Sequence, residues 1–203
     1  MLRHIVSSVA HRSAPVHSRL CSPFLSYTHG GPSRDESTLV IVEHDNVKLT
    51  PITLNAVTAA TKLGGDVTCL VAGKGCDSVV KEVSSIKGVK KVLFCDNAVF
   101  EGFLSESVTP LVLKVHEQHK FSHILAGASA FGKNLIPRIA VKLDVSPISD
   151  ITGIKSADTF VRTVYAGNAI QTVKSKDSVK CITSRGTSFE PAEASGGSAQ
   201  AEE

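Results

Sequence analysis

The sequence has 203 residues, of which 42% are hydrophobic and 20% are charged. This length and composition predict one globular domain of ordinary size and exclude wholesale disorder. No stretch approaches the run of about 18 apolar residues that a transmembrane helix needs, so a membrane-spanning protein is not expected.

The net charge of +3 comes from the first part of the chain. Residues 1–35 contain four arginines, seven serines and no acidic residue before Asp35, whereas the other 168 residues carry 18 basic and 18 acidic side chains. An arginine-rich, serine-rich and acid-poor N-terminus is typical of organelle transit peptides. We interpret residues 1–35 as a mitochondrial transit peptide, with a merely disordered terminus as the alternative. The charge balance of the remainder, with only ten aromatic residues in the chain, argues against nucleic-acid binding.

Short apolar runs alternate with helical patterns from residue 38 onward. Thr50 and Pro51 mark the start of the first helix, and Gly64 marks its end. Four strand–helix pairs in succession predict right-handed crossovers and a doubly wound, mostly parallel sheet with helices on both faces, a Rossmann-type α/β fold. The expected strands are 38–42, 67–72, 89–95 and 121–126, and the expected helices are 51–63, 77–86, 105–120 and a last one that begins near Asn134, because Pro137 suits a first helical turn.

The pattern changes after Pro147. Strand-like segments separated by turn residues predict an antiparallel extension of the sheet. From Glu190 the sequence contains four acidic residues, no basic residue and otherwise mainly small residues, which is typical of a flexible linker. We therefore divide the chain into a transit peptide (1–35), a domain (36–189) and a linker (190–203). The predicted extension strands are 150–155, 160–166, 169–174 and 179–184.

The cysteines and histidines predict no metal site. The five cysteines include no C-x-x-C pair and no zinc-type spacing with histidine. His116 and His119 share a helix face, but no third ligand is near them in the sequence. Cys69, Cys95 and Cys181 lie in apolar strand-like runs, where a reduced cysteine packs as a small hydrophobic side chain.

The segment Gly-Ala-Ser-Ala-Phe-Gly-Lys at 127–133 follows the fourth strand and precedes the fourth helix. In a doubly wound sheet such a loop can bind an anion through backbone N–H groups and a helix N-terminus, and Lys133 and Arg138 would add charge. Alternatively, its glycines simply allow close packing of strand and helix. The residues by themselves leave both interpretations open.

Three more specific active-site patterns are incomplete in this sequence. A nucleophile elbow requires a glycine two residues after Ser129, and here it comes three residues after it. A phosphate-binding P-loop requires Ser or Thr after Lys133, where this sequence has Asn134. The segment 43–45 (Glu-His-Asp) would face the 127–133 loop from the neighbouring strand, but no nucleophile or second acid completes an acid–base site. We assign no catalytic, cofactor-binding or metal-binding residue.

Five stretches of the chain, taken together, closely resemble the alpha subunit of electron transfer flavoproteins. They are STLVIVEH (37–44), LTPITLNAVTAATKLGGDVTCLVAG (49–73), HILAGASAFGKNLIPRIAVKLDVSPISDI (123–151), TFVRTVYAGNAIQTVK (159–174) and SRGTSFEPAEASGGSA (184–199).

The resemblance implies an FAD-dependent electron carrier rather than an enzyme. Members of this family are heterodimers of alpha and beta subunits in the mitochondrial matrix. They accept electrons from acyl-CoA and related dehydrogenases in fatty acid beta-oxidation and pass them to a membrane-bound quinone oxidoreductase. Most FAD contacts come from a C-terminal domain, and this sequence ends in the linker before it, so no FAD-contacting residue is carried over and these 203 residues alone are expected to bind no flavin.

The resemblance also bears on the 127–133 loop. The corresponding region of the related beta subunit holds a structural AMP, but in alpha subunits it is not a nucleotide site, which favours packing. We expect the domain to act as a scaffold against the beta subunit, through the strands at 160–174, with Arg162, Tyr165 and Asn168 as candidate contact residues. The alternative is a stand-alone nucleotide- or anion-binding module with no redox role.

Overall fold

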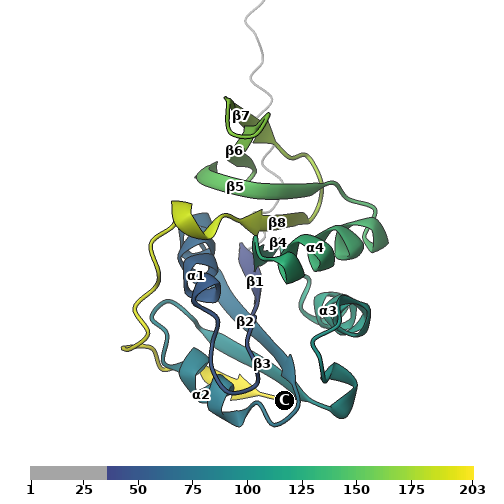
Figure 1. Ribbon diagram of the computed structural model, residues 1–203, viewed down its shortest axis with the longest axis vertical. Coiled ribbons are helices and arrows are strands. Elements are labelled where there is room, and N and C mark those ends of the chain that lie inside the picture. Colours follow the sequence, from purple (N-terminus) through teal and green to yellow (C-terminus); the bar gives the residue numbers. More distant parts are fainter. Residues whose placement is uncertain (1–35) are drawn as a thin grey trace, which may run out of the picture. The chain divides into compact units, whose positions relative to one another are not determined.

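The computed structural model describes residues 36–203, so the predicted transit peptide lies outside the described residues. Within them, one nine-stranded sheet has the order β7-β6-β5-β8-β4-β1-β2-β3-β9 (Figure 1). The strands from β5 to β9 in this order pair in parallel, and β6 and β7 continue the sheet antiparallel. The predicted doubly wound α/β fold is therefore confirmed. The strands are β1 (Ser37–Ile41), β2 (Asp66–Gly73), β3 (Lys91–Asp96), β4 (His123–Gly127), β5 (Pro147–Ser156), β6 (Thr159–Val164), β7 (Ala169–Lys174), β8 (Lys180–Ser184) and β9 (Gln200–Glu202).

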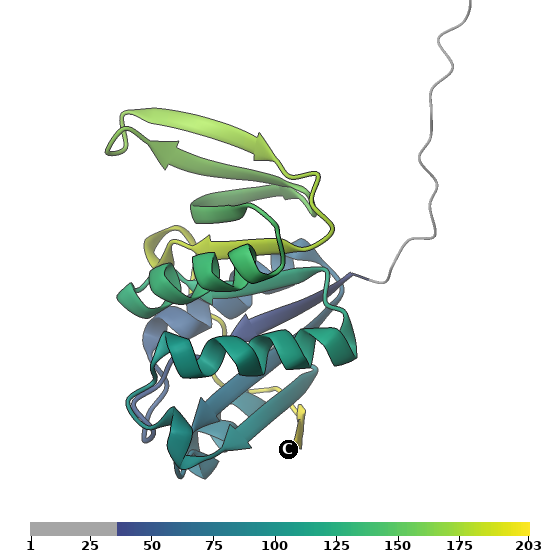
Figure 2. The same cartoon turned by 90° about the vertical axis from the view of Figure 1, so that its right-hand side faces the viewer.

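The helices cover both faces of the sheet. Figure 2 shows α3 and α4 side by side on one face, with α1 and α2 behind the sheet on the other. Each face has its own apolar core, because the central strands bury side chains on both sides. No helix among residues 36–203 combines the length and the apolar character that crossing a bilayer requires. The helices are α1 (Pro51–Leu63), α2 (Asp77–Ser84), α3 (Ser105–His119) and α4 (Ala130–Lys142), with short 3-10 turns η1 (Ala98–Phe100) and η2 (Gly186–Ser188).

The last predicted extension strand is misplaced. The segment 179–184 was expected to be antiparallel, but β8 lies inside the parallel sheet, between β4 and β5, and pairs in parallel with both. The physical reason is burial: Cys181, Ile182, Thr183 and Ser184 are all buried, as is typical of an inner strand covered on both faces. The antiparallel extension consists of β5, β6 and β7.

The predicted start of α4 is also wrong. The helix begins at Ala130, one turn before Asn134, because the Ser129 hydroxyl accepts a hydrogen bond from the N–H of Gly132 at 3.0 Å and caps it. Pro137 therefore lies inside the helix, where it cannot donate to the carbonyl of Lys133. The helix nevertheless continues to Lys142.

Residues 190–202, which we call the strap, have a defined position in the structure. The sequence predicts a flexible linker over 190–203, and in the structure the strap follows the outside of α1 and α2 and ends as β9, parallel to β3. In Figure 1 it is the yellow segment that passes beside α2. Its small residues fit close against the domain, as described below.

Candidate functional site

The candidate site lies where parallel strands end. β1 and β4 pair directly, as predicted, so the segment 43–45 and the loop 127–133 lie at the same edge of the sheet. The turn after β8, at 185–188, joins them there. In a doubly wound sheet this carboxyl edge is the usual place for a ligand.

His44 holds the end of β1 in place. Its Nε2 lies 3.1 Å from the carbonyl oxygen of Ala72, and its Nδ1 accepts a hydrogen bond from the N–H of Asn46 at 3.0 Å. Since a carbonyl only accepts, Nε2 carries the proton and the ring is neutral. Burial lowers the pKa of His44, against the opposing effects of its bond to Ala72 and of Asp45. Both ring nitrogens are thus used by the backbone, which leaves neither for acid–base chemistry.

The acidic neighbour of His44 is also structural. An oxygen of the Asp45 carboxylate accepts from the N–H groups of Val47 and Lys48, at 2.9 and 2.5 Å. These bonds close the turn after β1, and they are the main cause of a lowered pKa of Asp45. The structure brings 43–45 to the predicted edge but gives the side chains of His44 and Asp45 backbone partners.

Aromatic rings bridge this edge. The ring centroid of Phe103 lies 5.1 Å from that of His44 and 4.2 Å from that of Phe131 in the first turn of α4. These contacts link the end of β1 to the loop 127–133. The ring of Phe103 therefore packs between the two segments.

The glycines of the loop mark close backbone approach. A Cβ atom on Gly132 would lie 1.9 Å from the carbonyl oxygen of Gly127, so any side chain there would collide with β4. A Cβ atom on Gly127 would lie 2.8 Å from Cγ1 of Ile52, which reaches over the strand end from α1. Ile52 is also within 3.3 Å of the corresponding position on Gly186. This geometry supports the packing interpretation of the loop.

The two predicted cations do not converge on the loop. Arg138 faces α3, where its Nη2 lies 2.7 Å from Oε1 of Glu106, and its Nε donates to Asn134 at 2.8 Å. Lys133 is exposed, and its ammonium group has no hydrogen bond or ion pair within residues 36–203, although its charge helps to lower the pKa of Asp150. The structure thus separates Arg138 from the loop and leaves Lys133 at its rim.

One charged pair at this edge has no signal in the sequence. Arg185, after β8, forms a bidentate ion pair with Asp150 of β5, and this bond is the main cause of a lowered pKa of Asp150. The residues are 35 positions apart, and only the insertion of β8 beside β5 brings them together. Asp150 also has a left-handed backbone, with φ at 57°.

Two of the buried cysteines are packing groups. Burial raises the pKa of Cys69 and of Cys181 to about 12, so both thiols pack as hydrophobic groups. Among residues 36–203, no group of three His, Cys, Asp or Glu side chains is placed to hold a metal. The helix pair His116 and His119 therefore gains no third ligand within these residues.

A large groove lies away from the strand ends, between α3 and α4. It measures about 690 Å³ and is lined mainly by apolar groups, with the Glu106–Arg138 ion pair beside it. Val141, one of its lining residues, is 75% exposed. The lining provides surface for packing but no nucleophile. The other lining residues are Thr109, Pro110, Leu113, Pro137 and Lys142.

Comparison with known proteins decides the family. The model of the electron transfer flavoprotein domain matches residues 38–203, nearly all of the described chain. The chain belongs to the electron transfer flavoprotein family. Its domain is the N-terminal one of the alpha subunit.

Relatives of this electron transfer flavoprotein domain come from animals, amoebae and bacteria. The chain is 52% identical to a probable mitochondrial alpha subunit of Caenorhabditis elegans, over 82% of this chain and 50% of the relative. It is 48% identical to the mitochondrial alpha subunit of Dictyostelium discoideum, over 80% of this chain and 47% of the relative. The alpha subunit of Pseudomonas aeruginosa is 47% identical, over 81% and 53%. The chain thus spans about half the length of the curated relatives it matches.

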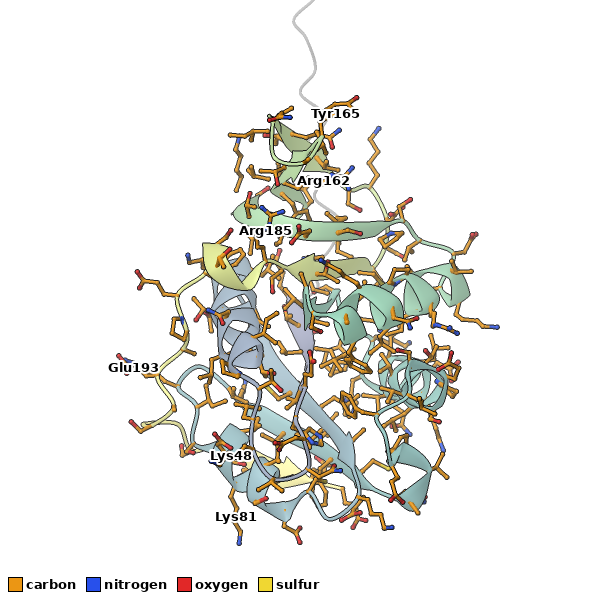
Figure 3. All side chains as sticks on the ribbon, in the orientation of Figure 1. Lys48, Lys81, Arg162, Tyr165, Arg185 and Glu193 are labelled. Carbon is orange, nitrogen blue, oxygen red and sulfur yellow. The ribbon has the colours of Figure 1, made fainter. Side chains whose placement is uncertain are left out.

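The antiparallel extension of this electron transfer flavoprotein domain carries exposed hydrophobic side chains. Figure 3 shows Tyr165 and Arg162 on the part of the extension farthest from α2. Tyr165 is 81% exposed and Ile170 is 77% exposed, while Nε of Arg162 donates to Gln171 on β7 at 2.9 Å. Asn168 ends the turn, its N–H donating to the carbonyl of Tyr165 at 3.1 Å. The three candidate contact residues are thus together on one hairpin.

Proposed function

We propose that this chain is the N-terminal scaffold domain of a mitochondrial electron transfer flavoprotein alpha subunit. The complete protein would carry electrons on FAD from acyl-CoA and related dehydrogenases to a quinone oxidoreductase of the respiratory chain. Residues 1–35 would direct it to the mitochondrial matrix. The family match over residues 38–203 carries this proposal.

The domain would contribute structure rather than redox chemistry. At the carboxyl edge of the sheet, Ile52, Phe103 and Phe131 take the space in which a Rossmann-type fold usually binds a nucleotide. These residues do not fit a flavin there, so we derive no electron-transfer step through this chain. FAD would be held elsewhere in the complete heterodimer, and the isolated 203 residues would show no flavin absorbance after purification. A stoichiometric flavin band would contradict this.

The beta subunit would bind the antiparallel extension. Support comes from the exposure of Tyr165 and Ile170 on neighbouring parts of one hairpin, because exposed aromatic and aliphatic side chains beside an arginine are common anchors of protein interfaces. The outer edge of β7 also has free backbone groups, since β7 is the last strand in the sheet order.

The experiment is a binding titration of the purified chain with the beta subunit. Tyr165→Ser and Ile170→Ser are expected to weaken binding about tenfold or more, the loss typical of an interface anchor. Val141→Ser is the matched control, because Val141 is as exposed as Ile170 but lies on α4. Equal weakening by all three variants, or by none, would contradict docking through the extension.

A further inference from the structure

The strap has the composition of a flexible linker but the contacts of a docked segment. It begins beyond Phe189, a buried residue whose carbonyl accepts from Nδ2 of Asn55 on α1 at 2.5 Å. The ammonium group of Lys62 lies 5.3 Å from the centre of the Phe189 ring. The chain is therefore fixed to α1 before the strap starts.

Backbone hydrogen bonds hold the strap along its length. Two of them satisfy carbonyl groups at the C-terminal end of α2, which have no partner within the helix. A side-chain-independent ladder of this kind holds an extended segment in one register. The bonds run from Ala192 N–H to the Leu54 carbonyl (3.2 Å), from Lys87 N–H to the Glu193 carbonyl (3.0 Å), from Gly197 N–H to the Ser85 carbonyl (2.8 Å) and from Ala199 N–H to the Ser84 carbonyl (3.0 Å).

The small residues of the strap are required by close contact. A Cβ atom on Gly197 would lie 2.2 Å from the carbonyl oxygen of Ile86, closer than any real contact of this kind. Gly196 has φ at 101°, a left-handed conformation that side chains disfavour, and it turns the chain toward α2. Ala192 and Ala199 pack against the apolar core beneath α1 and α2.

The charge of the strap matches the surface beneath it. The strap and the two residues that flank it contain four acids and no base. Two of these acids have lysine partners on the domain: Nζ of Lys87 lies 3.0 Å from Oε2 of Glu193, and Lys91 on β3 pairs with Glu202 on β9. Figure 3 shows Glu193 on this outer segment, on the side of the molecule where α2 lies.

We propose that residues 190–202 are a docking element that fixes where the polypeptide leaves the domain. The surface along α2 and the β3 edge recognises an acidic segment with glycine at 197 and small residues around it. The strap also covers the edge of β3, which would otherwise present free backbone groups to other chains. This proposal concerns residues of the domain itself, and it stands whether or not the proposed electron-carrier function is correct.

Amide hydrogen exchange of the full chain tests the proposal. The N–H groups of Gly197 and Ala199 are expected to exchange at least about 100-fold more slowly than in a free peptide of the same sequence, because both are hydrogen-bonded to α2. Free-peptide rates at both positions, with normal protection in β1 and β4, would overturn the proposal.

Two pairs of variants separate the steric and charged contributions. Gly197→Val is expected to abolish protection at 197 and 199, whereas Ser195→Val, at an exposed position two residues away, is expected to keep it. Lys91→Ala is expected to speed exchange of the β9 amides, and Lys90→Ala, which breaks an ion pair with Asp66 on the same side of the domain, is expected not to. Protection that is unchanged in both Gly197→Val and Lys91→Ala would overturn the proposal, and protection in β1 and β4 reports that each variant is folded.

Discussion

Two segments rich in glycine, alanine and serine have opposite interpretations from the sequence, yet in the structure both pack closely against another backbone segment. The loop at 127–133 has the appearance of a ligand-binding loop, and the strap has the appearance of a free linker. In both, a glycine lies against a backbone carbonyl. A Cβ atom on Gly132 would lie 1.9 Å from one carbonyl oxygen, and a Cβ atom on Gly197 would lie 2.2 Å from another. Small residues here indicate close approach of two backbone segments.

The two segments differ in what surrounds them. The loop follows the buried strand β4, and the ring of its Phe131 packs against Phe103, so a change there affects the core of the domain. The strap lies on the outside, where one face of most of its residues is exposed. A collision in the loop should therefore cost stability throughout the domain, whereas a collision in the strap should release only the strap.

The largest expected effect is that of Gly132→Ala. The new methyl group would collide with the Gly127 carbonyl, which belongs to a buried strand and cannot move freely. We expect a net loss of about 2 kcal/mol in the free energy of unfolding, measured with urea. Without the collision, alanine would stabilise the helix by about 1 kcal/mol, so even the sign of the change is informative. Ala130→Val, at an exposed position of the same loop, is the control.

Acidification should destabilise the domain through two buried histidines, His44 after the end of β1 and His123 at the start of β4. Burial lowers the pKa of His44 and of His123, whose Nε2 donates to the carbonyl of Ala157 at 2.7 Å. The folded protein then binds fewer protons than the unfolded chain, so this stability is complete above the ordinary histidine pKa of 6.5 and is lost as the pH falls below it.

The measurement is the free energy of unfolding between pH 7.5 and pH 5.5. Each histidine contributes a slope of at most about 1.4 kcal/mol per pH unit. His123→Gln, which keeps a donor for Ala157, should reduce the slope, and an unchanged slope would be inconsistent with a buried neutral ring.

On the strap, Lys91 holds the pKa of Glu202 below its ordinary value of 4.5, so that contact is present above pH 4.5 and is lost only at lower pH.

A smaller effect is expected from the contact between Ile52 and Gly127. Gly127→Ala would press against Cγ1, Cδ1 and Cγ2 of Ile52, whose side chain is partly exposed. In a double-mutant cycle with Ile52→Ala, we expect a coupling of about 1 kcal/mol, because the shortened side chain leaves room for the methyl group. If the changes in the free energy of unfolding are additive, Ile52 does not pack against the end of β4 in solution.

The smallest expected effect is that of Lys133→Ala on AMP binding. Lys133 is exposed, and the loop beside it is filled by packed side chains. Calorimetry is expected to detect no AMP binding by either form. Micromolar binding that is lost in the variant would restore the anion-binding interpretation of the loop.

Hydrophobic periodicity predicts most of this fold. The four strand–helix pairs, the start of α1 at Pro51 and its end at Leu63, before Gly64, agree with the structure, because buried parallel strands and amphipathic helices leave local patterns. The predicted start of α4 fails because the Ser129 hydroxyl caps the helix one turn before Asn134. The Asp150–Arg185 pair has no local pattern at all.

The sequence by itself determines the fold class, the family and the pairing of the first strand with the fourth. The fold class follows from patterns among residues that are neighbours along the chain or one helical turn apart, and the family follows from five stretches of sequence between residues 37 and 199. Only the tertiary structure decides that β8 enters the sheet between β4 and β5, that 127–133 is packed and that the strap is docked. Each of these depends on which backbone segment lies against a given glycine or strand edge. A small residue in the sequence indicates that another backbone segment packs closely against it, but it does not indicate which segment.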